Sequence, residues 1–273
     1  GRDSRKGWRT PFNAFASTHR ADDYCEGNAW QYTWLVPQDV DGLIGCFGSK
    51  EAFTTKLDSL FTVSSVIEGA DTSPDISGLI GQYAHGNEPS HHILYLYTMV
   101  GQPGKTADLV RRVLTTLYHD APDGLSGNED VGQMSAWYVL SSLGFYQVEP
   151  AGGRFWFGSP LFDRAEIAVR DGVMTVVAKN NSADNRYIQR VELDGQPYTK
   201  AYITYEDLAR GGVLEFEMGP EPKVWYCADE PGTYESQRPA ETERSFKSEA
   251  VEGEIARVCG LLTNERLRWM FAN

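Results

Sequence analysis

Apolar residues between positions 49 and 145 recur at the three- and four-residue spacing of amphipathic helices. Ser49 is a candidate N-cap of the first of these helices, with Glu51 in its first turn. Further apolar stripes lie at residues 93–100, 110–118 and 134–138, and residues 28–36 predict one more short helix. Each helix has an apolar face that must be covered by another helix. The pattern therefore predicts a helical region of about five packed helices.

From about residue 160 the apolar period changes to two, which is typical of strands. Asp171-Gly172 and Asp194-Gly195 are strong hairpin signals between such runs. Residues 228–248 are rich in Glu, Arg, Ser and Pro and read as a linker, followed by a weakly amphipathic end. We therefore predict an α+β protein with a helical part at 1–159, an antiparallel β module at 160–227, and a linker and tail at 228–273.

Charge and composition narrow the function classes. The chain has 38 Asp and Glu against 25 Lys and Arg, a net charge of −13, which argues against nucleic-acid binding and adhesion to anionic membranes. Aromatic residues make up 12%, which suits a large core and also ligands that stack on rings, such as sugars. The four cysteines lack CxxC spacing, which argues against a zinc ribbon.

Targeting signals are not evident in the sequence. No window approaches the roughly 18–20 apolar residues of a membrane span, so we expect none. We also find no signal-peptide pattern. The chain opens at Gly1 with a polar run, and it reads like a piece of a longer protein.

The first chemical cluster surrounds Glu26, which stands beside a glycine and ahead of a run of amide and aromatic side chains that includes Trp30 and Gln31. One interpretation is a general acid in a pocket that stacks against sugars. The other is a helix N-terminus with an ordinary glutamate that the helix dipole favours.

The second cluster, at residues 85–92, contains three histidines, an amide and a carboxylate. Adjacent His91 and His92 would point in different directions on a helix, so they are poor zinc co-ligands. A hard cation held by Asn87, Glu88 and backbone carbonyls is the better metal hypothesis. The alternative is a capped helix start with packed histidines.

The third cluster, at residues 127–137, has two acids flanked by glycines ahead of a helix that carries Trp137. Carboxylates at a helix N-terminus are kept ionised, as a general base must be. The alternative is a capped helix with a solvated acidic first turn. Glycoside hydrolysis with inversion needs one protonated and one ionised carboxyl, roughly 6.5–9.5 Å apart. Glu26 and Asp130 suit these two roles if the fold brings them together.

Long motifs in these clusters resemble the C-terminal part of glycoside hydrolase family 92, which comprises calcium-dependent exo-acting α-mannosidases found mostly in bacteria. They are EGNAWQYTWLVPQDVDGLIG from Glu26, GQYAHGNEPSHHILYLY from Gly81 and GNEDVGQMSAWYVLSSLGFYQVEP from Gly127. KNNSADNRYIQRVELDGQPY from Lys179 and GGVLEFEMGP from Gly211 resemble the closing β module of the family. The resemblance implies a partial (α/α)6 toroid over residues 1–159, and a mannose-containing glycan as substrate.

Site roles follow from the same resemblance. It implies Glu26 as general acid and Asp130 as general base of an inverting reaction. It implies calcium, with Asn87, Glu88 and Asp130 as metal residues, and pocket roles for Trp30, Gln31, His85 and Trp137. Many relatives have an aspartate where this chain has Asn128, so we assign the base to Asp130 alone.

Completeness of the enzyme is a separate expectation. The pattern predicts about five helices, fewer than a complete (α/α)6 toroid contains. We therefore expect activity to need the N-terminal part of the family's fold, from the same protein. Members are commonly exported, which implies a secreted or periplasmic protein. The alternatives are a non-catalytic carbohydrate-binding module, suggested by the aromatic residues and Asn128, and an inactive structural fragment.

Overall fold

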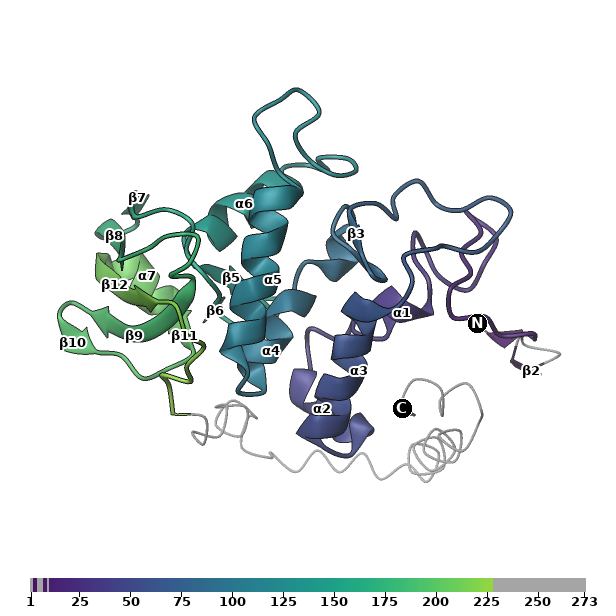
Figure 1. The fold of residues 1–273 in the computed structure, drawn as a ribbon, viewed down its shortest axis with the longest axis horizontal. Helices are drawn as coiled ribbons and strands as arrows, with labels where there is room; N and C mark the ends of the chain where they lie inside the picture. Colours follow the sequence, from purple (N-terminus) through teal and green to yellow (C-terminus); the bar gives the residue numbers. More distant parts are fainter. Residues whose placement is uncertain (1, 4–6, 9, 228–273) are drawn as a thin grey trace, which may run out of the picture.

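The computed structural model describes residues 2–3, 7–8 and 10–227, and the predicted linker and tail at 228–273 lie outside the described residues. Figure 1 shows a helical part next to a module of strands, which confirms an α+β protein. The helices are α1 (Ala29–Tyr32), α2 (Val40–Phe47), α3 (Lys50–Thr62), α4 (Leu96–Met99), α5 (Pro103–Thr116), α6 (Gln133–Ser142) and α7 (Tyr205–Arg210), with 3-10 turns η1 (Glu88–Ser90) and η2 (Ile93–Tyr95). The strands are β1 (Arg2–Asp3), β2 (Gly7–Trp8), β3 (Leu79–Ile80), β4 (Tyr83–Ala84), β5 (Phe145–Gln147), β6 (Arg154–Phe157), β7 (Arg164–Val169), β8 (Gly172–Lys179), β9 (Tyr187–Leu193), β10 (Gln196–Pro197), β11 (Tyr202–Thr204) and β12 (Gly212–Gly219).

The helices follow the apolar pattern with two differences. Ser49 caps α3 as predicted, because its Oγ accepts the Ala52 N–H at 3.1 Å. The helix predicted at 28–36 is a single turn, α1, whose Asn28 forms a capping box with Gln31. Helix α2 was not predicted, since its two glycines give a low helix propensity. It forms because its buried apolar face packs into the helical core and Asp39 caps its start.

The main sheet has five strands in the order β10-β9-β12-β8-β7. The hairpin at Asp194-Gly195 forms as predicted, with left-handed φ angles of 52° and 74° at these residues. The β7–β8 hairpin also forms, although Gly172 pairs with Val169, so the turn residues are Arg170 and Asp171. The prediction of a purely antiparallel module is wrong, since β12 runs parallel to β8. Parallel pairing needs a long connection, and β9 to α7 supply it.

A second, three-stranded sheet has the order β11-β6-β5. Strands β5 and β6 precede the boundary predicted at 159/160, yet β6 pairs with β11 beyond it. The core divides into two clusters of buried residues, one centred on α1 to α6 and one between the strands. The chain between residues 143 and 160 contributes to both clusters, so the helical part and the strands are packed closely together.

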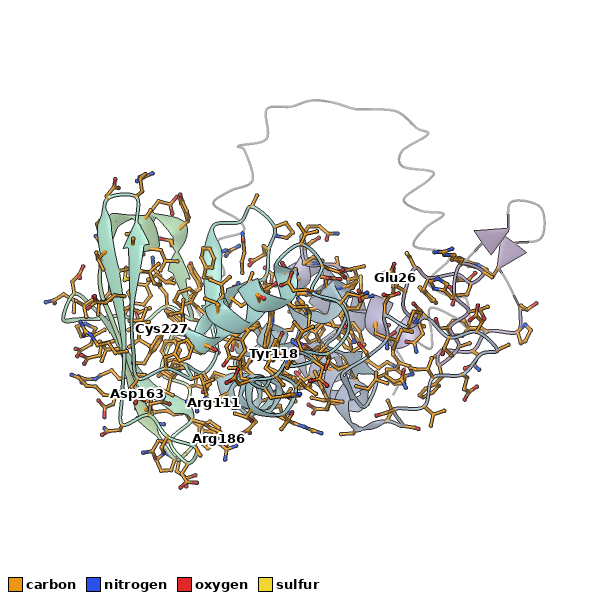
Figure 2. The ribbon with its side chains drawn as sticks, turned by 90° about the horizontal axis from the view of Figure 1, so that it is seen from above. Glu26, Arg111, Tyr118, Asp163, Arg186 and Cys227 are labelled. Carbon is orange, nitrogen blue, oxygen red and sulfur yellow. The ribbon has the colours of Figure 1, made fainter. Side chains whose placement is uncertain are left out.

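Arg111 of α5 ties the helical part to the β module. Its guanidinium donates to the carbonyl oxygens of Pro160 and Ser182 and to the side chains of Ser159 and Asn181. Burial and, to a smaller extent, the positive charge of Arg186 lower the pKa of Arg111 to about 10. Figure 2 shows Arg111 with Asp163 and Arg186 at the β module, away from Glu26. Within the described residues, no helix is both long enough and apolar enough to cross a bilayer.

Candidate active site

Three carboxylates from distant segments meet around Glu88, the first residue of η1. Burial raises the pKa of the Glu88 carboxyl, as do the nearby Asp130 carboxyl and the charge of Glu26, while its own backbone N–H lowers it. Glu88 Oε1 is buried and has no hydrogen-bond partner among the described residues. The candidate acid and the candidate base of the sequence therefore lie close to the same side chain.

Glu26 is held near Glu88 through the backbone. The Asn87 side chain donates from Nδ2 to the carbonyl oxygen of Glu26 at 2.9 Å, across a sequence separation of 61 residues. This bond uses the amide nitrogen of Asn87 and leaves its Oδ1 as the atom that could bind a cation. Asn87 itself is buried, whereas the Glu26 side chain is exposed and can reach a ligand.

Two glycines bring the Asp130 turn against the Glu88 turn. Gly127 has a φ of +73°, and a Cβ there would lie 2.6 Å from the carbonyl oxygen of Gly86. Only glycine at position 127 allows the two backbones to approach this closely. The glycine at position 127 is evident in the sequence, but the contact that requires it is seen only in the folded chain.

Glu129 and Asp130 have different roles in this turn. The Glu129 carboxylate accepts the backbone N–H of Gly132 and, at 3.1 Å, that of Ser135. These bonds lower the pKa of Glu129, first of all the bond from Ser135. Glu129 therefore caps the start of α6, which was the structural alternative for this cluster, while the exposed Asp130 side chain is not used as the cap.

Both candidate catalytic residues are among the seven described non-glycine residues with a positive φ angle. Glu26, Asp130 and Val131 have φ angles of 53°, 51° and 58° in the left-handed region, which non-glycine residues seldom adopt. For the β-branched Val131 this conformation is costly, and its side chain is fully exposed. Strained residues of this kind gather at functional sites. The strained backbone is consistent with a functional role for the turns that carry Glu26 and Asp130.

The four predicted pocket residues lie behind the carboxylates rather than among them. Trp30, Gln31, His85 and Trp137 are at most 5% exposed. Gln31 is used in the capping box and donates to the Gln82 carbonyl oxygen at 2.7 Å. Lys56 lies over the Trp30 ring at 4.4 Å. These side chains support the carboxylate-bearing turns from within the core, and their roles toward a sugar stay predictions.

His85 shows how tightly this support is hydrogen-bonded. Its Nδ1 lies 2.8 Å from the Tyr83 hydroxyl and its Nε2 lies 2.7 Å from the Tyr118 hydroxyl. The Tyr118 hydroxyl uses its only proton toward the Met134 carbonyl oxygen at 3.2 Å, so His85 Nε2 is the donor to Tyr118. Burial, followed by the charge of His91, lowers the pKa of His85 well below its usual value, in keeping with a neutral ring.

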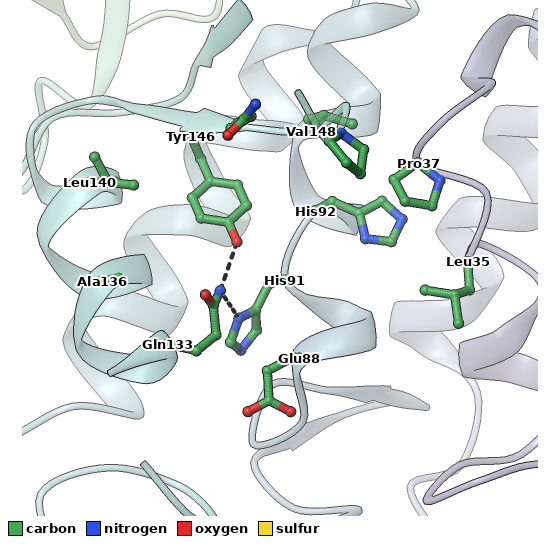
Figure 3. A pocket seen from close by; sticks show the side chains of 12 residues that line it. Leu35, Pro37, Glu88, His91, His92, Gln133, Ala136, Leu140, Tyr146 and Val148 are labelled. Carbon is green, nitrogen blue, oxygen red and sulfur yellow. Dashed lines mark hydrogen bonds between the residues drawn. The ribbon is translucent and has the colours of Figure 1, made fainter. Parts of the chain in front are cut away.

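A pocket of about 320 Å³ adjoins Glu88. Figure 3 shows Glu88, His91 and Gln133 close together in the lower part of the view, with Leu35 and Leu140 on opposite sides of the pocket and Val148 at the top. The pocket thus joins polar groups to an apolar wall, the combination that binds the hydroxyls and the C–H face of small polar ligands.

The oxygen donors around Glu88 suit calcium. The described residues hold no group of three or more His, Cys, Asp and Glu side chains arranged to bind a metal by themselves. Calcium takes roughly six to eight oxygen ligands, including amide and backbone carbonyl oxygens and water. Asn87 Oδ1, the unpartnered Glu88 Oε1 and the Asp130 carboxylate fit such a set, and the remaining ligands would come from other oxygens.

Acidification should destabilise the protein through His92, a buried residue that lines the same pocket as Glu88. Its Nε2 donates to the Trp34 carbonyl oxygen at 2.8 Å, and burial lowers its pKa from 6.5 to about 4. Between these two values the unfolded chain binds a proton that the folded protein excludes, so stability falls as the pH falls. We expect protonation of His92 to lower the free energy of unfolding by an amount on the order of 3 kcal/mol.

Unfolding midpoints measured from pH 7 to pH 4 should fall less in His92→Gln than in the wild type. The matched change at exposed His119 should leave the pH dependence unaltered, and equal slopes in all three proteins would contradict the assignment.

Several known proteins are similar to this chain. Residues 1–220 match the model of the glycosyl hydrolase family 92 catalytic domain. A solved family 92 α-mannosidase from Bacteroides thetaiotaomicron, in complex with mannoimidazole, is 40% identical with a TM-score of 0.76, over 82% of this chain and 30% of that one. A family 92 inverting mannosidase from the same organism is 36% identical with a TM-score of 0.68, over 81% of this chain and 30% of that one.

A curated protein of Arthroderma benhamiae, named an uncharacterized secreted glycosidase, is 27% identical over 78% of this chain and 26% of its own length. The chain therefore spans between 26% and 30% of the length of these relatives. The family match covers well over half of the 273 residues and confirms the resemblance drawn from the motifs. This chain belongs to glycosyl hydrolase family 92.

Proposed function

We propose that the full-length protein is an exo-acting, inverting α-mannosidase that hydrolyses terminal α-mannosides of glycans. The observation that carries the proposal is the proximity of the Glu26, Glu88 and Asp130 segments, which are far apart in the chain and are joined by the Asn87 bond to the Glu26 carbonyl oxygen and by the Gly86–Gly127 contact. The solved relatives named above support mannose as the sugar and inversion as the outcome. Both statements are transferred to this chain as proposals, since it covers only part of those proteins.

The reaction divides between the two exposed carboxyls. Asp130 accepts a proton from a water molecule as the water oxygen attacks the anomeric carbon. Glu26 donates a proton to the glycosidic oxygen as the bond to the leaving group breaks. The single displacement inverts the anomeric configuration and leaves Glu26 ionised and Asp130 protonated, so proton exchange with solvent restores the starting state.

Calcium is part of the proposal, and Asn87, Glu88 and Asp130 would hold it. When bound, calcium supplies positive charge that holds mannose hydroxyls and favours distortion of the ring. The protein contributes the oxygen donors, which are pinned by the Asn87 bond to the Glu26 backbone and by the Gly86–Gly127 contact.

The larger architecture is also proposed from the family. Helices α1 to α6 would form part of an (α/α)6 toroid, whose remaining helices would come from another part of the same protein, since this chain spans about 30% of the solved relatives. Export to the periplasm or the medium is proposed because one curated relative is named as secreted.

Hydrolysis by the full-length protein tests the proposal. We expect release of mannose from α-mannosides, with β-mannose as the first product in a time course of proton NMR spectra. Chelation of divalent ions should abolish turnover, and calcium should restore it better than zinc. Activity that is indifferent to chelation would refute the calcium assignment. Mannose binding without hydrolysis would instead favour a carbohydrate-binding module.

A further inference from the structure

The Glu88 and Asp130 turns lie close together although each carries a carboxyl group, and the two groups repel each other when both are ionised. A bond between the two turns would offset this repulsion whether or not a cation is bound. The Gly86–Gly127 contact allows the close approach but makes no bond that opposes the repulsion. Two polar side chains at matching places in the two turns, His91 and Gln133, form such a bond.

His91 and Gln133 each follow a carboxylate residue by three positions. The His91 N–H donates to the Glu88 carbonyl oxygen at 3.0 Å, and the Gln133 N–H donates to the Asp130 carbonyl oxygen at 3.2 Å. Each residue therefore closes the turn that carries its own carboxylate. The two side chains meet, with Gln133 Nε2 lying 3.0 Å from His91 Nδ1. Figure 3 shows this bond directly above Glu88.

The neighbouring hydrogen bonds determine which atom donates in the bond between Gln133 and His91. His91 Nε2 lies 3.0 Å from the His85 carbonyl oxygen, which can only accept, so Nε2 carries the ring proton. In the neutral ring with its proton on Nε2, Nδ1 is an acceptor. Gln133 must therefore present its amide nitrogen, whose second proton goes to the Tyr146 hydroxyl at 2.9 Å.

The surroundings leave these groups little freedom. His91 is 1% exposed, and its carbonyl oxygen accepts the indole N–H of Trp137 at 3.0 Å. Trp137 lies on α6 one turn after Gln133, so a second bond joins the same two elements. A misdirected amide at position 133 would leave a buried acceptor unpaired, which costs roughly 1–3 kcal/mol.

We propose that His91 and Gln133 are positioning residues whose side-chain hydrogen bond clamps the Asp130 turn to the Glu88 turn at the spacing that hydrolysis needs. The consequence for catalysis depends on the proposed function, whereas the clamp itself does not. Neither residue is the proposed acid, the proposed base or a proposed calcium ligand. The clamp acts on the placement of Asp130 and should therefore affect kcat more than KM.

Gln133→Leu in the full-length protein tests the clamp, because leucine has a similar size and would lie beside apolar Ala136 and Leu140. A misplacement of about 1 Å can cost a hundredfold, so we expect kcat to fall about tenfold to a hundredfold, with KM changed by less than about threefold. Tyr146→Phe is the matched control. It removes the other partner of the Gln133 amide and leaves the bridge to His91, so kcat should change by less than about threefold.

Hydrogen exchange provides a readout that needs no activity. The amide hydrogens of Gln133 and Met134 donate to carbonyl oxygens of the Asp130 turn. Mass spectrometry of peptides over residues 127–137 should show faster exchange in Gln133→Leu than in the wild type or Tyr146→Phe. Unchanged exchange in Gln133→Leu, or equal effects of both substitutions, would overturn the clamp. Faster exchange in a protein that hydrolyses no mannoside would retain the clamp and reject the proposed function instead.

Discussion

Asp130→Asn is expected to abolish practical turnover on every α-mannoside, whatever its leaving group. General-base assistance is worth about 10²–10⁴-fold, and an amide cannot accept the proton of the attacking water. The turn should survive the change, because Glu129 rather than Asp130 supplies the cap of α6. Loss of a carboxylate beside Glu88 also removes a repulsion, so folding should not suffer.

Steady-state kinetics of the full-length protein on an aryl mannoside and on a mannose disaccharide measure this effect. Asp123→Asn is the matched control, because this exposed acid lies on the loop that precedes the Asp130 turn. The control should retain wild-type kcat. If Asp130→Asn kept even a tenth of the wild-type kcat on either substrate, Asp130 would not be the base.

Glu26→Gln should have an effect that depends on the leaving group. A sugar leaves poorly without a proton, so loss of the acid should lower kcat on a mannose disaccharide by about 10²–10⁴-fold. An activated aryl leaving group departs as a stable anion and needs little protonation, so its hydrolysis should fall far less. The Glu26 backbone should keep its place, because the bond from Asn87 goes to the carbonyl oxygen and not to the carboxyl group.

The comparison of the two substrates within one variant is its own control. A folding defect would lower both rates by the same factor, whereas loss of a proton donor separates them. Equal losses on the disaccharide and the aryl mannoside would show that Glu26 acts in some way other than proton donation.

Local signals in the sequence predicted much of the secondary structure. The Ser49 cap and the apolar spacing behind it predicted α3, and Asp194-Gly195 predicted its hairpin. These succeeded because each depends on residues a few positions apart. Helix α2 was missed because its glycines oppose a helix that only burial against the core stabilises. The parallel pairing of β8 and β12 was missed because no local pattern specifies which distant strand a strand will meet.

For the site, the sequence identified the segments that contain the candidate residues, and the tertiary structure showed which residue in each segment is available for chemistry and which is structural. Glu26, Glu88 and Asp130 were all singled out by their neighbours in the chain, whereas their meeting depends on the Asn87 bond and the Gly86–Gly127 approach. The sequence could not show that Glu129 caps α6 while the neighbouring Asp130 does not. It also could not show that His85 and Trp137 are buried. The physical reason is that residue type and spacing determine which groups are present and how the nearby backbone bends. Burial, charge proximity and hydrogen-bond direction arise only when segments far apart in the chain come into contact.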